Sequence, residues 1–274
     1  NWEHIVPIYL PSADTNWGYK FLWAPGIIYD ECKYYLFYSA PWGSKADCRY
    51  DSCAVSDSPE GPFTEITGAA KTEQEPLLIF ERHKNEIAAD LVSPAVGHDG
   101  TTGFIKAIGP TPFIDPQTGK RYLFFVADLG TENNDNTSGA YCLEMTDWAT
   151  PKYDTLTRIT RYGKTTIDGT EDVQEGGKTN EGPMCYYKDG KYYLIFLTYT
   201  YYSTNYQVRA AVADNVLGPY TKLPMDDGAQ VMYTEPNFQR QAVGIHGMTN
   251  AGDSLMSAYM TFMNNVNYAT RTRN

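Results

Sequence analysis

The sequence predicts an all-β protein, and specifically a β-propeller built from repeated four-stranded antiparallel units. Three observations lead to this prediction. Aromatic residues make up 14% of the 274 residues, with 23 tyrosines, and such rings favour strands. Strand-like segments recur along the chain, and no amphipathic helix of note interrupts them. Internal copies of this kind are typical of a propeller rather than a sandwich.

One strand-like segment occurs in four copies. Each copy follows a turn signal such as Asp189-Gly190, and a second short apolar run precedes each turn. Two strands around a tight turn form a β-hairpin, so each copy predicts one hairpin. The copies are KYYLFY at 33–38, RYLFF at 121–125, KYYLIF at 191–196 and the weaker SLMSAY at 254–259.

A second element sets the size of the repeat. AVSDSPEGPF at 54–63 matches AVADNVLGPY at 211–220, about twenty residues after a hairpin. The first three copies of the hairpin segment begin at 33, 121 and 191, so their spacings are 88 and 70 residues. We predict one propeller domain over 1–274, with blade repeats starting near 22, 103, 179 and 243. Because a propeller hides its edges by closing the ring, we expect five blades, the first lying mostly upstream of Asn1.

The composition argues against several functions. The chain has 22 Lys+Arg and 33 Asp+Glu, a net charge of −11. This charge argues against nucleic acid or an anionic membrane as the main partner, since both attract clustered cations. No apolar run approaches the length of a membrane span. No glycine-rich nucleotide-binding motif is present.

The cysteines leave two alternatives open. Five cysteines form no CxxC pair, and Cys48 and Cys53 could close a small disulfide loop if the protein is exported. Buried thiols are the other interpretation. A glycosylation sequon begins at Asn136. We expect an extracellular or periplasmic location.

Several segments, in chain order, resemble glycoside hydrolase family 43. The resemblance runs over nearly the whole chain. That family comprises five-bladed β-propellers and includes β-xylosidases, α-L-arabinofuranosidases and arabinanases. The resemblance implies that the protein binds or hydrolyses O-glycosidic bonds in polysaccharides or oligosaccharides containing arabinose or xylose, by an inverting acid/base mechanism. The segments are Trp23-Ala24-Pro25, Phe113-Ile114-Asp115, Thr179-Asn180-Glu181-Gly182-Pro183 and 211–220.

Inverting hydrolysis needs two carboxyl groups, about 6.5–9.5 Å apart, on opposite sides of the anomeric carbon. One group donates a proton to the leaving oxygen and the other activates water. By the resemblance, Glu181 holds the general-acid position. Its pKa must be raised for it to carry a proton, which burial or a neighbouring negative charge can achieve. The alternative is that Glu181 only caps a strand.

Two further catalytic positions depart from the family. The resemblance places the general base in an Asp-Pro segment of the first blade, expected upstream of this chain. A third aspartate, which tunes the acid, is replaced here by Gly109, and Asp115 is predicted to form a hairpin turn. Gly26 stands where the family commonly has aspartate after Trp-Ala-Pro. The alternative function is therefore a catalytically inactive relative that serves as a carbohydrate-binding or structural module.

Other residues are assigned binding roles. Trp23 and Phe113 are predicted to form a sugar platform, and Arg209 to bond sugar hydroxyls. The resemblance makes His246 a candidate ligand of a structural calcium ion in the central channel, while no cofactor is required for hydrolysis. The acidic run at 168–175 is expected to be an exposed loop.

Overall fold

The computed structural model of the chain is all-β, as predicted. One short 3-10 helix, η1 (Tyr153–Thr155), is the only helix within the described residues. For 230–232 and most of 240–263, only the backbone is described. The structure describes residues 9, 22–42, 49–68, 72, 75–91, 107–127, 138–172, 175–176, 179–200, 203, 205–224, 230–232, 240–251 and 254–263.

Four antiparallel sheets make up the described part of the chain. The first contains β1 (Trp23–Asp30), β2 (Lys33–Pro41), β3 (Arg49–Ser56) and β4 (Thr64–Glu65). The second contains β5 (Ile108–Ile114), β6 (Arg121–Ala127), β7 (Gly139–Asp147) and β8 (Thr150–Pro151), with β9 (Thr157–Arg158) on β7. The third contains β10 (Asn180–Lys188), β11 (Lys191–Thr198), β12 (Gln207–Ala213) and β13 (Thr221–Lys222), with β14 (Gln230–Met232) on β12. The last contains β15 (Arg240–Ala251) and β16 (Ser254–Met263).

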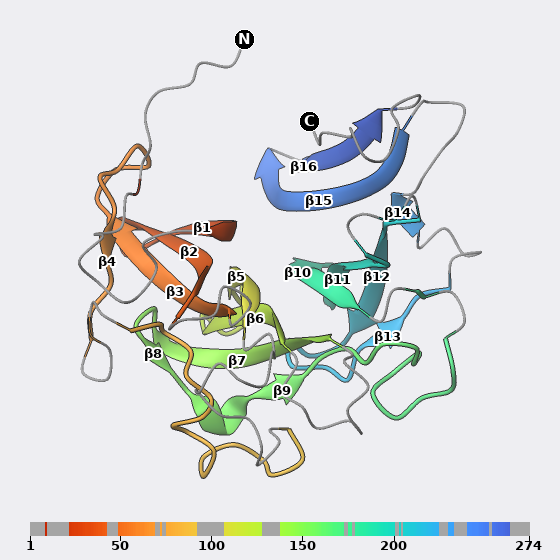
Figure 1. Cartoon of the computed structure of the whole chain (residues 1–274), viewed down its shortest axis with the longest axis horizontal. Helices are drawn as coiled ribbons and strands as arrows, with labels where there is room; N and C mark the ends of the chain where they lie inside the picture. Colours follow the sequence, from red (N-terminus) through yellow and green to blue (C-terminus); the bar gives the residue numbers. More distant parts are fainter. Residues whose placement is uncertain are drawn as a thin grey trace.

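The sheets stand around a common centre, with β1, β5 and β10 innermost (Figure 1). The predicted hairpins are confirmed, because β2, β6, β11 and β16 each pair antiparallel with the strand before them. The first strand of each sheet begins at residue 23, 108, 180 or 240. These positions lie close to the predicted blade starts near 22, 103, 179 and 243.

The core lies between neighbouring sheets. Successive side chains of a strand point to opposite faces, so Phe125 of β6 packs towards the first sheet with Phe37. Its neighbour Phe124 packs towards the third sheet with Phe196. Because both faces of β6 are buried, its sequence is a continuous apolar run rather than an alternating one.

Gly26 allows the two inner strands β1 and β5 to approach each other. A Cβ atom at this position would clash with the carbonyl oxygen of Pro110. Glycine is the residue that permits so close a backbone approach. Local packing at this position therefore leaves no room for the aspartate that the resemblance implies here.

Candidate functional site

Three of the predicted site positions gather where the inner strands begin. Trp23 opens β1, Gly109 is the second residue of β5, and Glu181 is the second residue of β10. The sheets repeat one strand order, so their first strands start at the same end of the molecule. Contact between neighbouring blades supports this placement, since a Cβ atom at Gly109 would lie 4.0 Å from the Cβ of Ala24.

Glu181 is half-buried, and its carboxyl group has a defined partner. The hydroxyl of Tyr206 donates to its Oε1 across 2.6 Å. The pairing of β10 with β11 shifts between Glu181 and Met184, and Gly182 has a φ of +58°. A bulge of this kind redirects the neighbouring side chains. The Glu-Gly-Pro segment thus interrupts the regular strand directly after Glu181.

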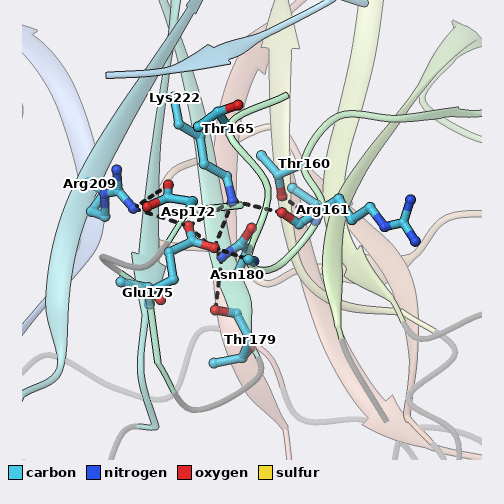
Figure 2. Close-up of polar contacts among 12 residues, drawn as sticks. Thr160, Arg161, Thr165, Asp172, Glu175, Thr179, Asn180, Arg209 and Lys222 are labelled. Carbon is cyan, nitrogen blue, oxygen red and sulfur yellow. Dashed lines mark hydrogen bonds and ion pairs between the residues drawn. The ribbon is translucent and has the colours of Figure 1, made fainter. Parts of the chain in front are cut away.

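A buried cluster of four charged side chains contacts Asn180 at the start of β10 (Figure 2). Its members are Arg209, Asp172, Glu175 and Lys222. Arg209 Nη1 lies 2.8 Å from Asp172 Oδ2 and 3.5 Å from Glu175 Oε1. Lys222 Nζ lies 2.7 Å from a carboxylate oxygen of Glu175 and donates to the carbonyl of Arg161 across 2.8 Å. Two cations therefore balance two carboxylates. Burial lowers the pKa of Lys222, and the carboxylate of Glu175 opposes this shift.

This cluster corrects one expectation and changes the role of a second residue. The run at 168–175 was expected to be exposed, but Asp172 and Glu175 are buried because Arg209 and Lys222 neutralise them. Arg209 was predicted to bond sugar hydroxyls. Its side chain is 1% exposed and also donates to the carbonyl of Leu223 across 3.0 Å. The structure gives the guanidinium protein partners in place of the predicted sugar contact.

The same cluster holds the residue that precedes Glu181. Asn180 Nδ2 donates to Glu175 Oε1 across 3.1 Å, and Asn180 N donates to the carbonyl of Ser138 across 3.2 Å. The hydroxyls of Ser138 and Thr179 lie 2.6 Å apart. The start of β10 is therefore fixed both to its own blade and to the preceding one.

The backbone at Gly109 is connected to a buried carboxyl group. Its N–H donates to Ser39 Oγ across 2.9 Å, and Ser39 Oγ donates to Asp51 Oδ1 across 2.7 Å. Burial raises the pKa of Asp51 well above its usual range. Within the part of the chain that is described, Oδ2 of Asp51 has no hydrogen-bond partner. The predicted tuning position thus lacks its own carboxylate, but a buried carboxyl lies two hydrogen bonds away.

The two predicted platform residues differ in their surroundings. Trp23 is 48% exposed, and the guanidinium carbon of Arg49 lies 3.5 Å from its ring centroid. One face of this ring is therefore covered by a cation, and only the other can stack on a sugar. Phe113 instead makes edge contacts with Phe124 and Tyr192 between the second and third sheets, at centroid distances of 6.2 and 6.4 Å.

The hairpin-turn role of Asp115 is confirmed. Asp115 Oδ1 accepts from the N–H of Gln117 across 3.0 Å and from the hydroxyl of Tyr192 across 2.8 Å. Thr118 Oγ1 donates to Oδ2 across 2.6 Å. Burial raises the pKa of Asp115, but hydrogen bonds from Thr118, Gln117 and Tyr192 outweigh it and leave the pKa below its usual value.

The metal prediction falls largely outside the described residues. The backbone of His246 lies in β15, but its side chain is not among those described. Within the described ranges, no three His, Cys, Asp or Glu side chains are arranged to hold a metal ion. Cys53 is a buried thiol with Sγ 3.6 Å from the carbonyl of Ala54, and Cys48 and Asn136 lie outside the description.

Sequence reasoning missed Tyr206, Glu175 and Asp51. Tyr206 stands just before the third strand of its sheet. This place at the start of a strand in a repeated unit is the sequence feature that could have identified it. Glu175 ends an acidic run, and such a run suggests an exposed loop, so the sequence pointed away from a buried carboxylate. Asp51 faces Ser39 in the pairing of β2 with β3, and this pairing is visible only once the register is known.

Comparisons with known proteins agree with this arrangement. Residues 97–273 match the family model described as glycosyl hydrolases family 43. An endo-1,4-β-xylanase structure from Bacteroides thetaiotaomicron is 24% identical, with a TM-score of 0.65, over 97% of this chain and 74% of that one. An endo-arabinase structure from the same organism is 20% identical, with a TM-score of 0.58, over 96% and 76%. An α-L-arabinofuranosidase structure from Lactobacillus brevis is 16% identical, with a TM-score of 0.61, over 89% and 66%.

The search of curated proteins gave no match. At these identities the structural likeness shows the fold, which is the five-bladed β-propeller that the resemblance implied. None of the helices in the described part of the chain has the length and apolar character needed to cross a membrane. The family model covers well over half of the sequence, and the chain therefore belongs to glycoside hydrolase family 43.

Proposed function

We propose that this protein acts on glycans containing arabinose or xylose, with Glu181 as the general acid of an inverting mechanism. The observation that carries the proposal is the position of Glu181 at the start of an inner strand, with Oε1 held by Tyr206. Trp23 opens β1, the inner strand of the first sheet, and its exposed ring offers one open face. Membership of the family and relatives named as xylanase, arabinase and arabinofuranosidase support this substrate class.

In the proposed reaction, Glu181 donates its proton to the glycosidic oxygen as the bond to the anomeric carbon breaks. Water attacks the anomeric carbon from the opposite face and loses its proton to a general base. The resemblance assigns that base to an Asp-Pro segment of the first blade. The sugar ring is expected to stack on the open face of Trp23.

A second candidate function is a non-catalytic, glycan-binding relative, and Gly109 is the observation that favours it. A carboxylate at this position would act as a neighbouring negative charge that keeps the acid protonated. Glycine supplies no such charge. Losing one acid–base contribution costs about 10²–10⁴-fold in rate, so we expect weak hydrolysis even where glycan binding is intact.

Hydrolysis and binding measured together distinguish the candidates. Phenyl α-L-arabinofuranosides and phenyl β-xylosides, whose leaving group needs the proton of the acid, are assayed with the wild type and Glu181→Gln, and oligosaccharide binding is measured by calorimetry. Hydrolysis that is lost in Glu181→Gln supports the acid role, and equal hydrolysis by both proteins contradicts it. Binding without hydrolysis identifies the second function. A chain that neither binds nor hydrolyses these sugars refutes both, and Trp23→Ala serves as the binding control.

We also propose an extracellular or periplasmic location and a calcium ion held with the help of His246. The glycosylation sequon that begins at Asn136 is the sequence feature that supports the location. For calcium, the melting temperature is measured with calcium and with a chelator, in the wild type and in His246→Ala. A calcium-dependent rise that is lost in His246→Ala supports the site, and equal rises in both proteins contradict it.

A further inference from the structure

The Tyr206 hydroxyl reaches Glu181 over the strand β11, which lies between β10 and β12 in the third sheet. Glu181 pairs with Leu197 of β11, and Leu197 pairs with Val208 of β12. Tyr206 stands two residues before Val208, so its side chain points to the same face of the sheet. From there its hydroxyl reaches Glu181 Oε1 at 2.6 Å.

Packing fixes the direction of this phenol. The Tyr206 side chain is 4% exposed. Its N–H donates to the carbonyl of Ser203 across 3.2 Å, and the N–H of Asn205 donates to Ser203 Oγ across 3.1 Å. The turn before β12 is thus closed on itself, and the ring has little freedom to move. The ring packs in an apolar cluster with Met184, Ile195, Leu197, Val208 and Ala210.

The bond makes the two oxygens of Glu181 inequivalent. A phenol has one hydrogen to donate, and here Oε1 accepts it. An oxygen that accepts this hydrogen is a poor place for the acid proton, which therefore belongs on Oε2. Gly109 offers no carboxylate to orient the acid, whereas the Tyr206 hydroxyl supplies a donor that holds the plane of the carboxyl.

We propose that Tyr206 is a positioning residue of Glu181, holding the carboxyl plane and favouring Oε2 as the place of the transferable proton. This proposal rests on the proposed function, because Glu181 must be the general acid for the orientation to matter in catalysis. The orientation itself can be measured without any hydrolysis, so the two proposals fail separately.

The first test is Tyr206→Phe, which keeps the ring and removes the donor. Titration of the Glu181 carboxyl is followed by carbon-13 NMR. A donor favours the ionised carboxylate, so its removal is expected to move the titration of Glu181 to higher pH. Where hydrolysis is measurable, kcat is expected to fall by about 10²-fold, as for a misplaced reacting group, with KM nearly unchanged.

Tyr153→Phe is the matched control. Tyr153 is also 4% exposed, and its hydroxyl bonds the backbone at Ile79 and Leu77, remote in sequence from Glu181. This variant removes a comparable buried hydroxyl and is expected to leave the Glu181 titration and kcat unchanged. A similar change in both variants would mean a general loss of packing and would overturn the proposal.

A second measurement covers the case in which Tyr206→Phe does not fold. In Glu181→Ala, Tyr206 keeps its ring packing and loses the carboxylate that accepts its hydrogen. The carbon-13 signal of the Tyr206 ring carbon that bears the hydroxyl is expected to shift, while that of Tyr153 stays in place. An unmoved Tyr206 signal, or a Glu181 titration that is the same with and without the Tyr206 hydroxyl, overturns the proposal.

Discussion

Replacing Gly109 with aspartate supplies a carboxylate where the resemblance places one, and the described residues leave room for it. Among the described residues, and apart from the chain neighbours of Gly109, the only atom within 4 Å of a Cβ at this position is the Cβ of Ala24, at 4.0 Å. The φ of Gly109 is +68°, in the left-handed region that aspartate tolerates better than most residues. We expect the substitution to cost about 1 kcal/mol of folding stability.

The expected effect on catalysis is a gain in rate. A negative charge close to the acid favours its protonated form, and one acid–base contribution is worth about 10²–10⁴-fold in rate. We therefore expect Gly109→Asp to raise kcat/KM by at least about 10²-fold on substrates that need protonation of the leaving group. Acidic phenols leave the anomeric carbon without that proton, so the hydrolysis of aryl glycosides that carry them should gain much less in rate.

The assay compares a phenyl and a dinitrophenyl glycoside in the wild type, Gly109→Asp and Gly109→Asn. Asparagine has the shape of aspartate and a similar tolerance of positive φ, but it carries no charge, so it isolates the electrostatic contribution. A folded Gly109→Asp protein that gains no more than Gly109→Asn would refute the reasoning. Equal gains on both substrates would also refute it, because a better acid must discriminate between leaving groups.

Two further predictions concern buried charges. Lys222→Met leaves the fully buried Glu175 without its main cation, and breaking such a pair costs about 3–5 kcal/mol. Urea unfolding measures this loss, which the exposed control Lys191→Met should not show. For Asp51, burial raises the folded-state pKa above the unfolded value of about 3.9. Wild-type stability is therefore retained below that pH and falls as the pH rises from there towards the folded-state pKa. Across this range, the melting temperature of Asp51→Asn should rise relative to that of the wild type as the pH rises. A constant difference would contradict the predicted direction of the Asp51 pKa shift.

The sequence was sufficient for the strands that repeat and insufficient for contacts between distant segments. The hairpins could be predicted because apolar runs and turn residues are local signals. The partners of Arg209 could not, because Asp172 lies 37 residues away in a loop, and an acidic run has the same appearance whether it is solvated or paired. The Gly109 position was recognisable, but its link to Asp51 depends on strand register, which no short segment encodes.

The four-charge cluster also constrains how this protein can evolve. Arg209, Asp172, Glu175 and Lys222 share one buried site in which two cations balance two carboxylates. Losing any one of them leaves an uncompensated charge in that site, whereas exchanging the whole group for apolar residues of similar volume can be neutral or even favourable. These positions are therefore expected to drift together or not at all. Their joint presence or loss among relatives would report whether the chain segment leading into Glu181 is still under selection.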